Sequence, residues 1–324
     1  MPTRSTPMNV NHILLPTDFS PAAEHALRWA VHFARQHDAT LHLLHVVAQF
    51  DADWFETDDA STPVGRVQAQ AQQDAEEGLK RIAPDLGRTG VQTQTIIRYG
   101  ADPAASILSV ADEVEADLIV TGTHGREGLA HVILGSVAEK VVREAHAPVL
   151  TVGAQAPSEP TIQRVLAPID FSEPSKAALR LAKRIVSANE ATLDLLFVAE
   201  ERTMPVFSDT GIPRVGRIKM DPEIVNNAAE GLEQLNRSLG GPEVSAHGHV
   251  AQGKVPDQIV QFAESHEVDL VVMATRGLSG LDRFLLGSVA ERVVRAAPCP
   301  VLTLNAHEQE GAPASSDAAS AESS

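Results

Sequence analysis

The sequence predicts an α/β protein made of two similar domains in tandem, each a roughly five-stranded parallel sheet with helices on both faces. The 324 residues are enough for two domains of ordinary size. Short apolar runs alternate with longer helical patterns, as they do in doubly wound α/β sheets. Several segments also recur at one constant offset along the chain, which indicates that one domain has been repeated.

Four segments of the first half return 152 residues later in similar form. They are Pro-Thr-Asp-Phe-Ser at 16–20 and Pro-Ile-Asp-Phe-Ser at 168–172, the Leu-Leu-x-Val runs ending at Val46 and Val198, the Leu-Gly-Ser-Val-Ala-Glu segments starting at Leu134 and Leu286, and the Pro-Val-Leu-Thr segments starting at Pro148 and Pro300. A period of this size is that of a domain, not of a solenoid repeat. We therefore expect a first domain over residues 1–153, a linker over 154–162, a second domain over 163–305 and a tail over 306–324.

Within the first repeat, five short apolar runs are predicted to be strands, and four helical patterns separate them. The strands are expected at 12–16, 41–47, 91–97, 118–122 and 149–152, and the helices at 21–35, 64–83, 103–115 and 136–145. Ser20 followed by Pro21 is a typical helix start, with an N-cap side chain and a proline in the first turn. The second repeat has the same pattern, and strands that alternate with helices imply parallel pairing.

The last strand of each repeat predicts how the two domains meet. Residues 149–152 and 301–304 would leave an exposed apolar edge if they were unpaired. We expect the domains to pack through these strands about a pseudo-twofold axis, which would make the monomer an intramolecular pseudo-dimer. A homodimer of the whole chain remains an open alternative.

The composition argues against several classes of protein. With 43% hydrophobic and 21% charged residues, the chain should fold. Its formal net charge of −17 opposes binding to the phosphate backbone of a nucleic acid. No apolar run is long enough to span a bilayer or to serve as a signal peptide, so a cytoplasmic location without a membrane partner is expected. The tail from about residue 306 is rich in Ala, Ser and acidic residues and is expected to be disordered.

Neither a disulfide nor a metal site is expected. Cys299 is the only cysteine and stands between two prolines, so we interpret it as a small hydrophobic residue in a reducing compartment. His247 and His249 share one face of a predicted strand and form a potential zinc-binding pair, but no third ligand is evident.

Two loops of the first repeat lie where an open α/β sheet binds ligands, outside the carboxyl ends of its strands. Asp18 follows the first strand and can accept a hydrogen bond from a ligand amine. Gly122 and Gly125 follow the fourth strand, and Gly135 with Ser136 opens the next helix. Glycine lets a ligand approach the backbone closely, and the free N–H groups of a helix N-terminus suit a phosphate.

The spacing Gly122-x2-Gly125-x9-Gly135-Ser136, with Pro-Thr-Asp at 16–18 upstream, resembles the motif of ATP-binding universal stress proteins. The resemblance covers about residues 11–153 and 163–304, so the chain is similar to a tandem member of that family. It implies Rossmann-like domains of the adenine nucleotide alpha hydrolase type, ATP with or without Mg²⁺ as the bound cofactor, and a role in the stress response.

The resemblance also implies which residues contact the nucleotide. In the first repeat these are Pro16, Thr17, Asp18, Val46, Gly122, Thr123, His124, Gly125, Arg126, Gly135, Ser136 and Val137. In the second repeat these are Pro168, Ile169, Asp170, Val198, Ala274, Thr275, Arg276, Gly277, Gly287, Ser288 and Val289. By the same resemblance, the aspartate and the valine contact the adenine, the glycine loop approaches the ribose and the phosphates, and the helix start holds phosphate oxygens.

Simpler interpretations exist for several of these residues. Asp18 can help to cap the helix that follows it. Val46 and Val198 belong to a residue type that fills the core of parallel sheets. His124 and Arg126 can donate to a phosphate or point into solvent.

The second repeat departs from the motif at one position, because Ala274 replaces the first glycine. If the backbone there has a positive φ, the alanine is strained. If φ is negative, one methyl group narrows the approach of a phosphate. Either way we expect weaker or altered nucleotide binding in the second repeat.

Three classes of function compete. A nucleotide-binding regulatory module fits the motif best. An ATP-consuming enzyme would need a phosphate-binding loop of the Gly-x4-Gly-Lys-Ser/Thr type, which is absent, or the Ser-Gly-Gly-x-Asp-Ser loop of ATP-cleaving relatives, where this chain has residues 17–20. We therefore assign no catalytic residue and expect slow ATP hydrolysis at most. A pure interaction scaffold is the third class, since some family members lack the motif, and its protein partners cannot be read from the sequence.

Overall fold

The computed structural model describes residues 10–49, 63–123, 134–157, 159–200, 203–207, 213–217, 222–239, 244–276 and 286–305. The first half contains β1 (His12–Pro16), α1 (Pro21–His37), β2 (Thr40–Ala48), α2 (Pro63–Thr89), β3 (Thr93–Gly100), α3 (Pro103–Glu113), β4 (Leu118–Gly122), α4 (Ser136–Glu144) and β5 (Val149–Val152). The second half contains β6 (Arg164–Pro168), α5 (Glu173–Asn189), β7 (Thr192–Glu200), β8 (Thr203–Phe207), β9 (Pro213–Arg217), α6 (Pro222–Ser238), β10 (Ala246–Gly253), α7 (Val255–Ser265), β11 (Leu270–Ala274), α8 (Ser288–Ala296) and β12 (Val301–Leu304).

Ten of these strands form one continuous sheet that runs through both halves. Its order is β10-β7-β6-β11-β12-β5-β4-β1-β2-β3, so each half contributes five strands. All neighbours within a half are parallel. The predicted fold class, two doubly wound α/β domains in tandem, is confirmed.

The two halves join where β5 pairs with β12 in an antiparallel register, with Val301 opposite Thr151 and Thr303 opposite Val149. The Oγ1 atom of Thr151 donates to the carbonyl of Val301 at 3.0 Å, and that of Thr303 donates to Val149 at 3.2 Å. The predicted pairing of the two last strands is therefore confirmed. Because this one pair is antiparallel, the carboxyl ends of the strands lie at opposite edges of the sheet in the two halves.

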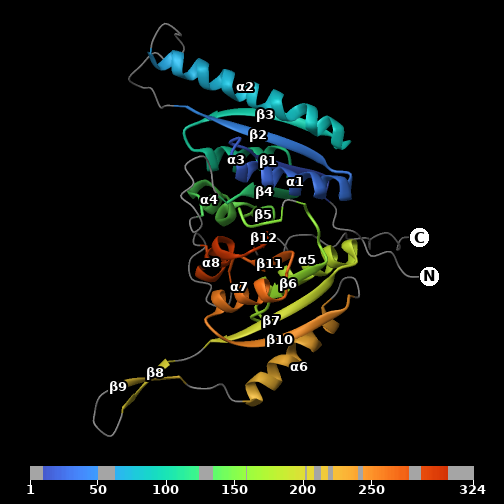
Figure 1. The fold of residues 1–324 in the computed structure, drawn as a ribbon, viewed down its shortest axis with the longest axis vertical. Coiled ribbons are helices and arrows are strands. Elements are labelled where there is room, and N and C mark those ends of the chain that lie inside the picture. Colours follow the sequence, from blue (N-terminus) through green and yellow to red (C-terminus); the bar gives the residue numbers. More distant parts are fainter. Residues whose placement is uncertain are drawn as a thin grey trace, which may run out of the picture.

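Helices cover both faces of the sheet. α1, α2, α5 and α6 share one hydrophobic cluster that spans both halves, and α3 with α4, and α7 with α8, form clusters on the other face. Figure 1 shows α4 and α8 on one side of the strands and α1 and α5 on the other. Parallel strands need this cover because both of their faces are apolar.

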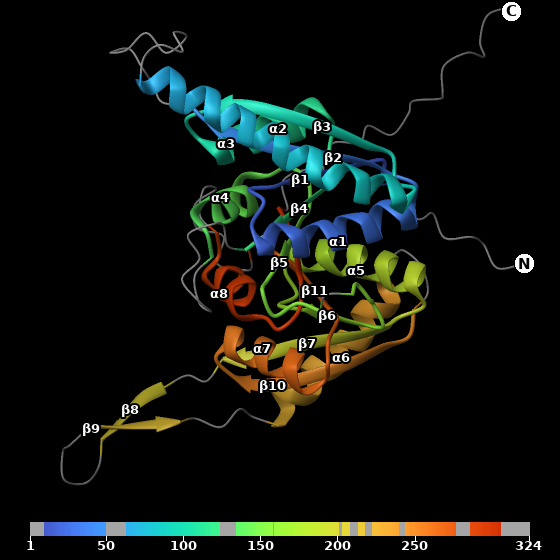
Figure 2. The ribbon, with the colours of Figure 1, turned by 45° about the horizontal axis from the view of Figure 1, so that its top comes forward.

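Element boundaries differ from the prediction where a local signal competes with tertiary packing. The third strand is β3 at Thr93–Gly100 instead of 91–97, since its register against β2 pairs Leu41 with Thr93 and Ala48 with Gly100. α2 continues past the predicted end at residue 83 and through Pro84, an exposed position, and Leu86 beyond the proline is buried. The antiparallel pair β8–β9 was not predicted, and it projects from the body of the second half (Figure 2).

The thiol of Cys299 is buried, and burial raises its pKa to about 12. The thiolate is therefore scarce at any physiological pH, which supports its interpretation as a hydrophobic residue. We expect the native protein to resist a thiol reagent at mildly alkaline pH and to react fully after denaturation. Rapid labelling of the folded protein would contradict this.

Candidate functional site

The second half has a cavity of about 310 Å³ at the carboxyl ends of β6, β7 and β11. Ten residues predicted from the sequence line it: Pro168, Ile169, Asp170, Val198, Ala274, Thr275, Arg276, Gly287, Ser288 and Val289. The eleventh, Gly277, lies outside the described residues. Val198 is also a member of a buried core cluster, so this side chain both fills the core and lines the cavity.

The described counterparts in the first half occupy equivalent places in the fold. Pro16, Thr17 and Asp18 end β1 and lead out of it, Val46 lies in β2, Gly122 and Thr123 end β4, and Gly135, Ser136 and Val137 open α4. His124, Gly125 and Arg126 lie outside the described residues. Since the two carboxyl edges are opposite, these two sets of residues lie at opposite edges of the sheet.

The aspartate after the first strand of each half shapes the turn into the next helix. One carboxylate oxygen of Asp18 accepts from the backbone N–H of Ser20 at 3.0 Å, and Asp170 does the same with Ser172 at 3.0 Å. The serine in turn caps its helix, since its Oγ accepts from the N–H of Ala23 in the first half. The helix cap is thus the serine, and the aspartate supports it from two positions upstream.

The phenylalanine of this turn is held in a conformation that its residue type seldom adopts. Phe19 has φ 61° and Phe171 has φ 64°, both in the left-handed region. The ring of Phe19 packs so closely on α2 that a Cβ at Gly78 would lie 2.5 Å from it. This packing offsets the backbone strain and fixes the direction in which the aspartate leaves the strand.

The helix that follows the glycine loop begins without a side-chain cap in both halves. Gly135 and Gly287 are the N-cap residues of α4 and α8, and neither helix has a side-chain hydrogen bond at its start. The first residues of α8 line the cavity. The N–H groups of this turn and the positive end of the helix dipole therefore face a space that can take an anion.

Gly287 is required by a close backbone approach. Its N–H donates to the carbonyl of Thr275 at 3.0 Å, and a Cβ at Gly287 would lie 2.7 Å from the same oxygen. Gly135 makes the matching hydrogen bond to Thr123 at 2.7 Å. These contacts tie the start of each helix directly to the end of the neighbouring strand.

Ala274 does not carry the strain that a positive φ would impose. It is absent from the described residues with left-handed backbone, and its methyl group packs in the cluster under α5, on the face opposite the cluster around α7 and α8. In the first half, a Cβ at Gly122 would lie 2.9 Å from the backbone of Ala22 in α1. Glycine at that position therefore serves helix packing, and weaker binding in the second half stays a prediction without the strain argument.

The two halves differ in charge at the start of their third helix. In the first half, Asp102 caps α3 and pairs with Lys140, whose hydrogen bond lowers the pKa of that carboxyl. In the second half, Lys254 is the N-cap of α7, next to the cavity residue Val255, and Arg292 takes the place of Lys140. The acid–base pair is thus replaced by two cations, and Asp257 in the first turn of α7 stands where the first half has Ala105.

Asn305 links the second cavity to the first half of the chain. Its Nδ2 lies 3.3, 3.1 and 2.8 Å from the carbonyl oxygens of Val142, Arg143 and Ala145, at the end of α4. Its Oδ1 accepts from the hydroxyl of Thr275, which lines the cavity. We call this set of contacts the Asn305 clasp.

The equivalent position in the first half is Gly153, 152 residues earlier, and it has no side chain to form a second clasp. A Cβ at Gly153 would have no neighbour closer than 4.0 Å. A cavity of about 640 Å³ lies there instead, between residues 153–155 and the last turn of α8. Among the residues that the structure describes, the Asn305 clasp therefore has no equivalent asparagine at the other end of the seam.

Neither a metal cluster nor a membrane-crossing helix occurs among the residues that the structure describes. His249 Nε2 lies 2.8 Å from Asp194 Oδ1, and its ring packs against Phe262. The side chain that the sequence offered as half of a zinc pair is thus engaged with a carboxylate and an aromatic ring.

Seven residues of the cavity were not expected from the sequence: Ser175, Leu196, Glu200, Val255, Ile259, Met273 and Ala290. Glu200 is the most informative, because it ends β7 and adds a carboxylate to the wall. A residue at the end of the second strand often binds the ribose hydroxyls in nucleotide-binding α/β folds. Applied to the end of the second strand, that rule would have found Glu200, whose counterpart in the first half is Ala48.

Comparison with known proteins gives a consistent result. The universal stress protein family matches residues 9–153 and again 161–305. A universal stress protein of Mycolicibacterium smegmatis is 30% identical over 300 residues, which cover 90% of this chain and 96% of that protein. One from Methanocaldococcus jannaschii is 35% identical over 149 residues, 46% of this chain and 85% of its own. The crystal structure of a universal stress protein from Archaeoglobus fulgidus superposes with a TM-score of 0.68 at 21% identity, covering 91% of this chain and 98% of its own, which shows a shared fold.

Proposed function

This chain belongs to the universal stress protein family, and we propose that each half binds one adenine nucleotide, ATP with or without Mg²⁺, at the carboxyl edge of its five strands. We take residues 1–153 and 163–305 as the two binding domains, with a linker over 154–162 and a tail over 306–324. The observation that carries the proposal is the cavity of about 310 Å³, which gathers ten of the residues expected to touch the nucleotide.

The wall of the cavity offers a partner for each part of the ligand. The carboxylate of Asp170 and the apolar side chain of Val198 suit an adenine, whose amine donates and whose ring is flat. Glu200 suits the ribose hydroxyls. The uncapped start of α8 and the guanidinium of Arg276 suit the phosphates. In the first half, Asp18, Val46 and the start of α4 would have the same tasks.

The proposed role is regulatory, in the cytoplasm and in response to stress, with nucleotide occupancy altering the affinity for a protein partner. The described cavity residues include no lysine, and no cluster of acidic ligands for a metal occurs in the described ranges. We therefore propose no dedicated catalysis and expect slow hydrolysis at most.

The first test is analysis of the small molecules that the purified protein carries, followed by titration. We expect mass spectrometry of a heat-denatured sample to detect an adenine nucleotide. Calorimetry with ATP, ADP and AMP, with and without Mg²⁺, should fit two sites per chain. No heat and no thermal shift at millimolar nucleotide would remove the proposal and leave the scaffold interpretation.

A second test separates the ligand role of Asp170 from its structural role. In Asp170→Asn, the remaining amide oxygen can still accept from Ser172, so the turn into α5 should survive. The amide NH₂ replaces the oxygen that would accept from the adenine amine, and we expect ATP affinity at the second site to fall by roughly tenfold. The melting temperature should stay within a few degrees of the wild type. Unchanged affinity with an unchanged melting temperature would show that Asp170 only shapes the turn.

A further inference from the structure

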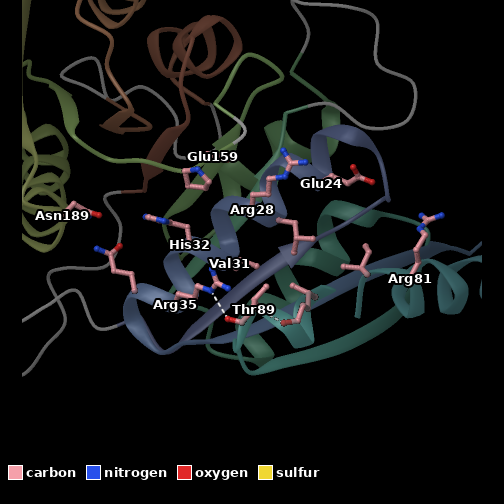
Figure 3. Close-up of a pocket in the computed structure, with 14 residues that line it drawn as sticks. Glu24, Arg28, Val31, His32, Arg35, Arg81, Thr89, Glu159 and Asn189 are labelled. Atoms are coloured by element: carbon pink, nitrogen blue, oxygen red, sulfur yellow. Dashed lines mark hydrogen bonds between the residues drawn. The ribbon is translucent and has the colours of Figure 1, made fainter. Parts of the chain in front are cut away.

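A groove of about 1010 Å³ lies along the outer side of α1, and it shares no lining residue with the cavity of about 310 Å³ in the second half. Four segments form its walls: one face of α1, the last part of α2, the linker residues Glu159 and Pro160, and Asn189 at the end of α5 (Figure 3). The residues of α1 that line it run from Glu24 to Gln36, a length of about 18 Å at the ordinary rise of a helix.

The two halves differ at a residue in the middle of the groove. In the second half, Lys183 of α5 is buried, and its Nζ donates to the carbonyls of Asn236 and Leu239 at 3.1 and 3.0 Å at the end of α6. The equivalent residue of α1 is Val31, whose short side chain cannot reach α2 in this way and lines the groove instead.

The groove has an apolar floor. Leu27 and Val31 of α1 and Ile82 of α2 are half-buried there, and Leu86 of α2 is buried beneath them. These side chains lie against the core cluster under the first half of the sheet. Apolar surface that is continuous with a core and still reached by solvent is typical of a binding groove.

Its rims are cationic, although the whole chain carries a net charge of −17. Arg28 of α1 and Arg81 of α2 line the groove and form no ion pair or hydrogen bond with any residue in the described ranges. Arg35 donates its Nε–H to the carbonyl of Thr89 at 2.9 Å, which ties α1 to the end of α2 (Figure 3). Three guanidinium groups thus surround the floor, against the carboxylates of Glu24 and Glu159.

Two buried polar atoms of the lining also lack a partner within the part of the chain that the structure describes. They are Nε2 of His32 and Oε1 of Gln36, both on the groove face of α1. Burial, together with the charge of His37, lowers the pKa of His32, so its imidazole is neutral at physiological pH. Buried polar atoms are nearly always hydrogen-bonded in folded proteins, so each of these two can gain a partner if its side chain turns toward a polar group in the groove.

From these features we infer that the groove binds a single-chain anionic amphiphile, meaning an apolar tail that ends in a phosphate or carboxylate. The tail would cover Leu27, Val31 and Ile82, and the head group would pair with the arginines. Charge complementarity favours this occupant over a neutral or cationic one, since the lining has three arginines against two glutamates on a protein whose net charge is −17. The linker and the end of α5 add walls beyond the two helices, which favours a small molecule over the helix of a partner protein. This site is independent of the proposed nucleotide sites.

Dodecyl phosphate, kept below its micelle concentration, is the probe for the test. We expect calorimetry on the full-length protein to show one site per chain, with no binding of dodecyltrimethylammonium and none of inorganic phosphate alone. The double variant Arg28→Ala/Arg81→Ala should weaken binding at least tenfold, because two charge-assisted contacts are lost. Val31→Trp, which fills the floor, should abolish it.

The matched control is Arg180→Ala, since Arg180 is the counterpart of Arg28 in the second half and does not line the groove. It should leave the affinity for dodecyl phosphate within twofold of the wild type. The affinity of a variant is compared with that of the wild type only if the two proteins have similar melting temperatures. If Val31→Trp fails to fold, Leu27→Asp provides the second measurement. The inference is overturned if dodecyl phosphate does not bind, if the arginine and floor variants bind it as the wild type does, or if the protein binds only to vesicles of anionic lipid.

Discussion

Replacing Gly287 by valine should weaken ATP binding at the second site by roughly 10- to 100-fold and lower the free energy of unfolding by about 2 kcal/mol. The new Cβ would lie 2.7 Å from the carbonyl oxygen of Thr275, a backbone atom that cannot move without disturbing β11. The start of α8 must therefore shift away from the strand, and the N–H groups that would hold the phosphates move with it. Calorimetry with ATP and denaturation in urea measure the two effects.

The control for Gly287→Val is a glycine whose substitution meets nothing. Gly87 lies in α2, is exposed, has no positive φ and has open space where a Cβ would be built. Gly87→Ala should leave ATP binding unchanged and stabilise the protein slightly, because alanine favours a helix over glycine by up to about 1 kcal/mol. Equal ATP affinity of Gly287→Val and the wild type would show that the start of α8 does not hold the nucleotide.

Replacing Asn305 by alanine should lower the free energy of unfolding by about 2 kcal/mol. The variant loses the amide that lies against three carbonyls at the end of α4 and the acceptor of the Thr275 hydroxyl. These groups are partly buried, so they are left without full compensation by water. Urea denaturation followed by circular dichroism measures the loss, and we expect the transition to broaden as the two halves become less coupled.

Two further variants test the Asn305 result, one as a control and one as an attempt to build the same contact at the other end of the seam. Gln70→Ala removes one exposed hydrogen bond within α2 and should change the free energy of unfolding by less than about 0.5 kcal/mol. Gly153→Asn places an amide at the open end of the seam, near the last turn of α8, and should stabilise the protein by about 1 kcal/mol if it forms the missing clasp. A neutral Asn305→Ala would show that the clasp adds nothing to stability.

Sequence alone predicted the parts of the fold that depend on local pattern. β1, β4 and β5 have the predicted bounds, because each is a short buried run between clear helix or turn signals. The antiparallel seam followed from the need to cover two apolar edges. The register of β3, the passage of α2 through Pro84 and the β8–β9 pair depend on tertiary contacts, which a single sequence does not display.

The candidate site follows the same division. The repeat predicted Asp170, Gly287 and Ser288 as site residues, and in the structure they line one cavity. Which glycine is needed for close packing and which alanine is tolerated could not be read from residue types, since Gly122 is constrained by α1 and Ala274 packs under α5. Glu200 escaped notice because its counterpart is an alanine, so the repeat gave no signal there.

The Asn305 clasp has a consequence for the halves as separate molecules. Two copies of the second half, joined through β12 alone, would place an asparagine against the last turn of α8 on both sides of the junction. Two copies of the first half, joined through β5, would have Gly153 on both sides and no such contact. Self-association should therefore be tighter for isolated residues 163–305 than for isolated residues 1–153. In the intact chain, covalent linkage to the second half gives the first half a partner whose Asn305 stabilises the junction.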